Sequence, residues 1–186
     1  MSSGYQTRSA IEPEPHGSHF LLQIRDFDRS RRDIDRSGIT RFTPGLAHNN
    51  TILEDGDVVF LAKGARNFAA VVHDLPSPCL AASYFFVLRP NSKILPNYLV
   101  WFLNQSISRQ YFLKFATTGA HMPIIRRDVL MEMEIPVPSL ATQQRIVEVD
   151  ALAQRQQVLL AELAEKKQLL ATTLCTQVAN GQITLN

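Results

Sequence analysis

The chain has 186 residues, which is about the length of one domain and leaves little room for two. Hydrophobic residues make up 45% and charged residues 19%, a composition typical of a folded globular protein rather than a disordered one. Nineteen Lys and Arg against 17 Asp and Glu give a net charge of only +2. This net positive charge is smaller than that of a dedicated nonspecific nucleic-acid binder. Any DNA-binding charge must therefore be concentrated on one face.

The sequence contains no sign of a membrane or of an oxidising compartment. The longest apolar runs are short, such as residues 58–62, and the opening residues MSSGYQTRSA contain no apolar h-region. The two cysteines, Cys79 and Cys175, are far apart and do not form a disulfide framework. We therefore expect a cytoplasmic protein that does not contact a membrane.

Residues 1–18 contain Ser, Gly, Pro and scattered charge without a period, which predicts a frayed or loosely docked leader. Residues 19–138 are predicted to form a strand-rich domain, because β-branched and aromatic runs alternate with turn residues there. A change to helical spacing predicts helices after the strands. The expected elements are strands at 20–24, 58–62, 68–72 and 81–88, one or two helices within 97–115, a short helix at 127–133 and an extended stretch at 135–138.

Residues 139–186 have a different composition. No Gly or Pro occurs from Leu140 to Asn180, and most residues there are good helix formers. Ser139 stands at the N-cap position, where its hydroxyl can accept the Thr142 N–H, and Gly181 stands where a C-terminal stop belongs. The fold class expected is thus α+β, with one C-terminal helix about 60 Å long.

Apolar side chains form a stripe along this helix, interrupted by Gln156 and Lys167. A helix of about 60 Å is longer than the diameter of a domain this small, so its own globule cannot cover the stripe. The stripe therefore requires another helix, from a second copy or from another protein. Its residues are Val149, Leu152, Leu159, Leu160, Leu163, Leu170, Leu174 and Val178, of which all but Leu160 are our predicted dimerisation contacts.

Catalytic patterns are missing from the sequence. It has no P-loop, no Gly-x-Ser-x-Gly elbow and no Cys/His spacing typical of zinc. His16 and His19 form a pair without a third ligand, and residues 54–57 are better explained as a turn. We expect no enzyme activity, no cofactor and no metal.

Residues 25–41 contain six arginines and four aspartates and are predicted to be an exposed loop or ribbon. The aspartates can be interpreted as a metal-binding loop, or as counter-charges for the arginines, which we favour. Arginine contacts guanine and phosphate well, so three polar, mostly basic loops on one body favour DNA binding, although local ion pairs on a solvated surface remain the alternative for each residue. The candidates are Arg29, Arg31, Arg32, Arg36 and Arg41; Lys63, Arg66 and Asn67; and His121, Arg126 and Arg127.

The segment IPVPSLATQQRIV at 135–147, followed by the long helix and Gly181-Gln182-Ile183, resembles the specificity subunit of type I restriction-modification enzymes. The order of the upstream motifs is similar to that family over about residues 19–183. These motifs are LQIRD at 22–26, DGDVVF at 55–60, LRP at 88–90, PNYL at 96–99 and the Thr118-Gly119 turn.

Two departures from the family pattern are visible. The family usually has Pro in place of Ser139 and Glu in place of Thr142, so the reciprocal capping-box bond is lost while Ser139 can still cap. Family subunits also contain two target-recognition domains and two such helices, whereas this chain has one of each. The resemblance therefore implies a half-length form.

That resemblance implies binding to double-stranded DNA, with methylation and cleavage performed by partners: an adenine methyltransferase subunit and an ATP-dependent nuclease subunit. A homodimer formed through the C-terminal helix would read two short inverted half-sites. On family grounds we expect antiparallel helices, since parallel ones would crowd both domains at one end. The alternative is a helix-mediated assembly protein whose α/β head does not read DNA sequence.

Overall fold

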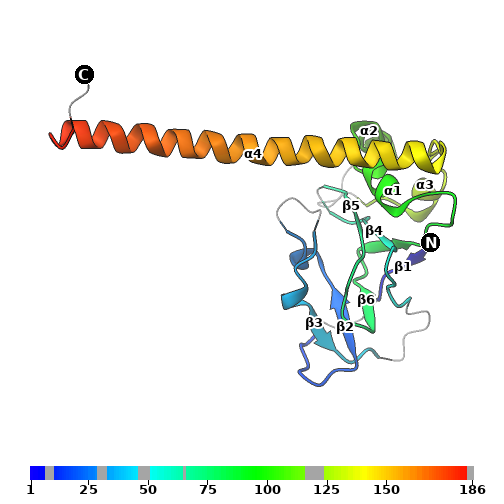
Figure 1. Cartoon of the computed structure of the whole chain (residues 1–186). Coiled ribbons are helices and arrows are strands. Elements are labelled where there is room, and N and C mark those ends of the chain that lie inside the picture. Colours follow the sequence, from blue (N-terminus) through cyan, green and yellow to red (C-terminus); the bar gives the residue numbers. More distant parts are fainter. Residues whose placement is uncertain (7–10, 29–32, 46–50, 65, 116–123, 184–186) are drawn as a thin grey trace. The chain divides into compact units, whose positions relative to one another are not determined.

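The computed structural model describes residues 1–6, 11–28, 33–45, 51–64, 66–115 and 124–183, which form two compact units, residues 1–144 and 145–186 (Figure 1). Within these ranges no helix combines the length and apolar character needed to cross a membrane. The elements are β1 (Ser2–Ser3), β2 (His19–Leu22), η1 (Ile24–Asp26), η2 (Arg36–Gly38), β3 (Thr40–Phe42), β4 (Val58–Leu61), β5 (Ala69–Val71), β6 (Cys79–Ala81), β7 (Phe85–Leu88), α1 (Pro96–Leu103), α2 (Ser106–Phe115), α3 (Arg127–Met131) and α4 (Leu140–Ala179).

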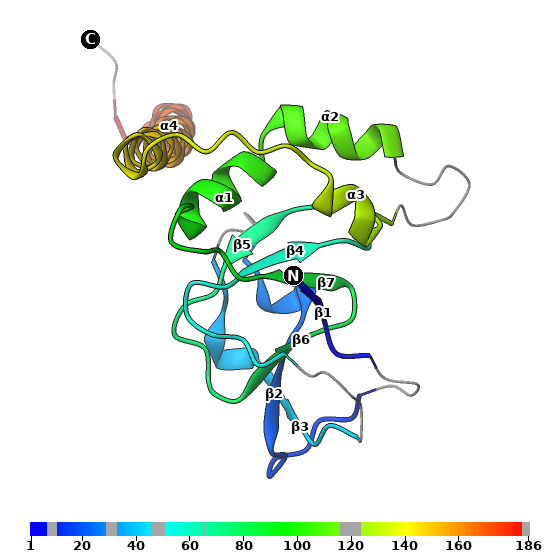
Figure 2. The same ribbon diagram turned by 90° about the vertical axis from the view of Figure 1, so that its right-hand side faces the viewer.

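The first unit is an α+β head with two sheets. Strands β1, β7, β4 and β5 form an antiparallel four-stranded sheet in that order. Strand β2 pairs antiparallel with β3 and parallel with β6 in a second, three-stranded sheet. Helices α1, α2 and α3 lie over one side of the four-stranded sheet (Figure 2).

Strand β4 is the centre of the core, and all four of its residues are buried. Val58 and Phe60 pack with α1 and α2, while Val59 and Leu61 pack with the three-stranded sheet. Side chains of a strand alternate between its two faces, so one apolar run contributes to both core clusters. A continuous apolar strand is therefore what this buried position requires.

The single strand predicted at 81–88 is wrong, because the structure divides this run between the two sheets. Residues 79–81 form β6 beside β2, and residues 85–88 form β7 beside β4. A turn closed by the Phe85 N–H donating to the Ala82 carbonyl separates them, at 3.0 Å. Both halves are apolar because both are buried, so the hydrophobic pattern did not mark the break.

The leader expectation is also wrong for residues 2–5. Strand β1 pairs with β7, and Tyr5 is a buried part of the core. Gly4 allows this docking, because a Cβ there would lie 2.1 Å from the Ala82 carbonyl oxygen. Close backbone approach, which the composition of the segment does not reveal, fixes this end of the chain.

The predicted long helix is confirmed as α4, with the predicted ends. The Thr142 N–H donates to Ser139 Oγ at 3.2 Å, as an N-cap should. Gly181 has a φ of +71°, and the N–H of Gln182 donates to the Gln177 carbonyl at 2.9 Å. This left-handed glycine ends the helix.

Candidate nucleic-acid interface

The turn between β4 and β5 presents the second group of predicted DNA-binding residues. Lys63 and Arg66 are exposed there. Asn67 is half-buried, and its side-chain amide donates to the Leu61 carbonyl at 2.8 Å, which closes the turn. Asn67 therefore shapes the turn, while Lys63 and Arg66 present charge on it.

The segment before α3 lies directly against this turn. Lys63 forms an isolated β-bridge with Ile124, and the Ile125 N–H donates to the Ala62 carbonyl at 2.8 Å. Ile125 is buried, so the segment is anchored. The structure thus brings two of the three predicted basic loops together, and we call Lys63, Arg66, Arg126 and Arg127 the basic corner.

Part of the charge in the basic corner is already engaged within the chain. Arg126 donates to both carboxylate oxygens of Asp128, at 3.1 and 2.7 Å. Arg127 donates to the Met1 carbonyl at 2.9 Å. Both arginines remain exposed, so these contacts orient the guanidinium groups without hiding them from a ligand.

The first predicted group, the arginine-rich segment of residues 25–41, contacts the residues that lead into β5. The Phe27 ring packs edge-on against the Phe68 ring with centroids 5.0 Å apart, next to Asn67 in the chain. This contact places Phe27, near the start of the arginine-rich segment, against the residue that follows Asn67. Four of the predicted DNA-binding residues lie outside the described residues: Arg29, Arg31, Arg32 and His121.

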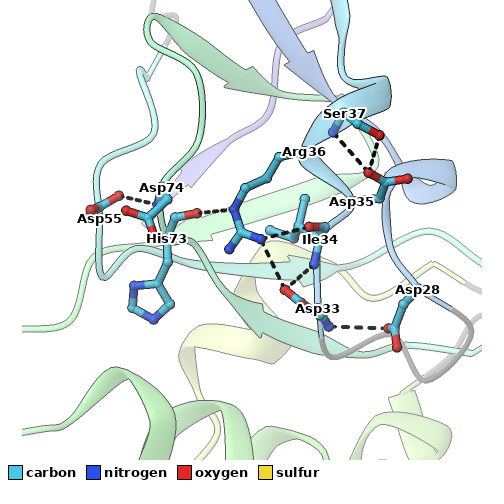
Figure 3. Close-up of polar contacts among 9 residues, drawn as sticks. All are labelled: Asp28, Asp33, Ile34, Asp35, Arg36, Ser37, Asp55, His73 and Asp74. Atoms are coloured by element: carbon cyan, nitrogen blue, oxygen red, sulfur yellow. Dashed lines mark hydrogen bonds and ion pairs between the residues drawn. The ribbon is translucent and has the colours of Figure 1, made fainter.

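Arg36 lies elsewhere in the head and is held by backbone and carboxylate groups. Its guanidinium donates to the carbonyls of His73 and Ile34, at 3.2 and 3.1 Å, and lies 3.5 Å from Asp33 (Figure 3). His73 follows the end of β5, away from the turn that begins β5. Arg36 therefore joins two loops at the end of the β4–β5 hairpin opposite Lys63.

The aspartates around Arg36 bind backbone groups. Asp35 accepts hydrogen bonds from the Ser37 N–H and hydroxyl, which lower the pKa of its carboxyl (Figure 3). Asp28 accepts from the Asp33 N–H, and Asp33 accepts from the Ile34 N–H. In the described part of the chain no group of three His, Cys, Asp or Glu side chains is placed to hold a metal ion.

Arg41 is engaged in the three-stranded sheet rather than at the basic corner. Its Nε donates to the Gly17 carbonyl at 2.6 Å, and its guanidinium lies 5.3 Å from the centre of the Phe20 ring. These contacts attach the segment before β2 to β3. Arg41 therefore contacts both the segment before β2, at Gly17, and β2 itself, at Phe20.

The second unit is the rest of α4, and its apolar stripe is open in the single chain. Leu152 is 71% exposed, although leucine is normally buried. Six of the seven predicted dimerisation residues are exposed and the seventh, Val178, is half-buried. The six are Val149, Leu152, Leu159, Leu163, Leu170 and Leu174.

Sequence reasoning gave no role to Gln143, which the structure buries completely. It lies in the first turn of α4 among exposed polar residues, so no periodic signal distinguishes it. Its side chain accepts from the Leu95 N–H and donates to the Lys93 carbonyl, about 50 positions earlier in the chain, and also donates to the Pro138 carbonyl.

Comparison with known proteins agrees with this architecture. No curated protein sequence matches the chain. The solved structure of the HsdS subunit from Thermoanaerobacter tengcongensis has a similar fold, with a TM-score of 0.64 and 22% sequence identity. The match covers 86% of this chain and 41% of that chain, so our chain spans less than half of its length.

The family model of the type I restriction modification DNA specificity domain matches residues 43–157. This range is more than half of the chain and includes β4, the basic corner and the first part of α4. The family is one of DNA-recognition subunits without catalytic activity of their own. The chain belongs to the type I restriction modification DNA specificity domain family.

Proposed function

We propose that this protein is a DNA-sequence specificity subunit that binds a bipartite target as a homodimer. The observation that supports the proposal most directly is the family match across both the head and the start of α4. The basic corner then supplies the phosphate and base contacts, since arginine and lysine pair with both. We expect further DNA contacts from Arg29, Arg31, Arg32 and His121.

Homodimerisation follows from the open stripe on α4. Two copies related by a twofold axis present the same stripe to each other, which buries the exposed leucines. With antiparallel helices, two heads attached at the starts of helices about 60 Å long are separated by more than one DNA turn of about 34 Å. The target is therefore two identical inverted half-sites with an unspecified spacer.

The polar faces of α4 are candidates for docking the enzyme's other subunits. By the resemblance in sequence, these are an adenine methyltransferase, which binds S-adenosylmethionine, and an ATP-driven nuclease, acting together on cytoplasmic DNA. The alternative for each face residue is simple contact with solvent. The candidate residues are Arg145, Glu148, Arg155, Glu162, Glu165 and Lys166.

Selection of duplexes from a randomised pool tests this proposal. We expect enrichment of two short inverted copies at a fixed separation, and binding that weakens steeply with salt because the protein displaces phosphate counterions. Sedimentation of the free protein should give a dimer. Equal, weak binding to all sequences would overturn the proposal and favour the helix-mediated assembly protein.

A further inference from the structure

Arg25 differs from the other described arginines of the arginine-rich segment. The guanidinium of Arg36 donates to two backbone carbonyls, and that of Arg41 donates to one. Arg25 binds no carbonyl in the described part of the chain, and its Nη2 donates to the hydroxyl of Thr40 instead. Its side chain is 62% exposed, against 39% for Arg36. Among the described arginines of this segment, Arg25 is therefore the one with a guanidinium that is both exposed and not used to hold a backbone loop.

The contacts of Arg25 hold one edge of its guanidinium. Nη2 binds Thr40 Oγ1, and Nε lies 3.9 Å from Asp26 Oδ1, which is beyond hydrogen-bond distance. Nε and Nη2 belong to the same edge of the planar fork, so both neighbours lie along that edge. Nη1 has no partner among the residues that the structure describes. A planar group held along one edge presents its remaining N–H groups in a defined direction.

The two neighbours of this guanidinium are buried and held by the fold. Asp26 is 4% exposed, and its Oδ2 accepts a hydrogen bond from the Gln23 N–H at 2.7 Å. Thr40 is 7% exposed and pairs with Leu21 between β3 and β2. A long side chain that is already oriented loses less conformational entropy when a ligand binds. The fold therefore preorganises Arg25 for binding.

Tyr84 connects the backbone beside Arg25 to the basic corner. Its hydroxyl accepts a hydrogen bond from the N–H of Ile24, the residue before Arg25, at 3.1 Å. Its carbonyl accepts from the N–H groups of Ala62 and Lys63, at 2.8 and 3.4 Å. The turn between β6 and β7 thus binds the backbone next to Arg25 on one side and that of Lys63 on the other. Arg25 is therefore attached to the same part of the head as the basic corner.

We propose that Arg25 is a specificity-determining residue that reads a guanine in the major groove of each half-site. The inference rests on the proposed function for its DNA target. Arginine binds guanine O6 and N7 through two N–H groups, an arrangement that requires a fixed orientation of the fork. A guanidinium held by buried neighbours fulfils this requirement. The basic corner supplies phosphate contacts beside it, which position the head but carry no sequence information.

Arg25→Lys is the sharpest variant, because it keeps the positive charge and removes the planar fork. Thr40→Val is the second variant: it keeps the shape of the buried side chain and removes the hydroxyl that accepts from Arg25. The matched control is Arg41→Lys, the same change within the same segment, at an arginine that is engaged with Gly17 and Phe20.

The test uses the full-length protein and the duplex that selection enriches. Each guanine of one half-site is replaced in turn by 7-deazaguanine, which lacks the N7 acceptor. The parent and Arg41→Lys should lose affinity about tenfold at one particular guanine. Arg25→Lys changes both copies in the dimer, so it should bind the unmodified duplex about a hundredfold more weakly and lose nothing further at that guanine. Thr40→Val should fall between the parent and Arg25→Lys.

Full sensitivity of a folded Arg25→Lys protein to 7-deazaguanine at every position would overturn the inference. Equal weakening on all sequences would overturn it as well, because Arg25 would then contact phosphate. Loss of the near-ultraviolet circular dichroism of the head in Arg25→Lys would show that Arg25 holds the head together, which also contradicts a reading role.

The parent protein separates this inference from the proposed function. Failure of the parent to prefer any sequence would contradict the proposed function, and the reading role of Arg25 with it. A parent that selects a sequence without any guanine sensitive to 7-deazaguanine would overturn the role of Arg25 alone.

Discussion

Arg89 and Asp57 form a bidentate ion pair between two neighbouring strands of the four-stranded sheet. Arg89 follows β7 and donates from Nε and Nη2 to the two carboxylate oxygens of Asp57, which precedes β4, at 2.8 Å each. Asp57 is buried at 2% exposure, and its carboxylate also accepts from the Glu54 N–H at 2.9 Å. Glu54 adds a second carboxylate 2.9 Å from Arg89, and these partners raise the pKa of the guanidinium. The pair fixes the register of β7 beside β4 at the edge of the core.

Arg89→Ala should therefore destabilise the head. Removing the guanidinium leaves a buried carboxylate with the Glu54 N–H as its remaining donor. Hydrogen bonds to charged groups contribute about 1.5–3 kcal/mol. We expect a loss of free energy of unfolding within that range, measured by urea denaturation. Arg109→Ala, an exposed arginine of α2, is the control and should change stability little. Equal effects of the two substitutions would contradict the role of the pair.

Asp26→Asn should stabilise the protein at neutral pH. Desolvation by burial raises the pKa of Asp26 in the folded state, outweighing the hydrogen bond from Gln23 and the charge of Arg25. Folding thus favours the neutral carboxyl, and its contribution is fully present below the unfolded pKa of about 3.9 and lost as pH rises through the folded pKa. Melting temperatures across pH should show a gain for the variant at pH 7 that shrinks on acidification. A gain that grows on acidification would reverse the assigned sign.

The two cysteines should differ in reactivity. Burial raises the pKa of the Cys79 thiol to about 12, so the reactive thiolate is scarce, and the side chain lies within β6. Cys175 is exposed on α4. Titration with a thiol reagent at pH 8 should count one thiol in the native protein and two in guanidinium chloride. Two rapid equivalents in the native protein would show that β6 is not buried.

Leu163→Glu should abolish dimerisation. Leu163 is 48% exposed in the middle of the stripe, where a carboxylate in each copy would be desolvated against the other. Sedimentation should then give a monomer with unchanged helix content. Gln168→Glu adds the same charge away from the stripe and should remain dimeric. A dimeric Leu163→Glu protein would show that another surface holds the copies together.

Substitution of the basic corner should weaken DNA binding without unfolding the head. In Lys63→Ala and Arg66→Ala, exposed side chains are shortened at a turn whose closure depends on Asn67. Each lost phosphate contact should lower the slope of log affinity against log salt by about 1. Arg31→Ala should also weaken binding, since that residue belongs to the arginine-rich loop. Arg41→Ala is the comparison, because Arg41 binds Gly17 and Phe20, and it should not change the salt slope.

Several features of the candidate site could not be read from the sequence. The arginine count suggested one basic loop of five residues, but Arg36 and Arg41 are held by carbonyl groups of His73 and Gly17. Hydrogen bonds to backbone carbonyls cannot be read from composition. The sequence therefore does not distinguish an arginine that holds a loop from an arginine that is available to a ligand. Lys63 and Arg126 lie on separate loops, and nothing local in the sequence indicates that Ile124 pairs with Lys63.

The sequence by itself determined α4, its Ser139 cap, its glycine stop and its apolar stripe, because helix propensity, capping and 3.6-residue spacing act between near neighbours. It also determined that residues 58–61 form a strand. The tertiary structure decided which strands pair, how residues 79–88 divide between two sheets, and why Gln143 is buried. These outcomes depend on contacts between residues tens of positions apart, where packing and the need to satisfy buried backbone groups outweigh any local preference.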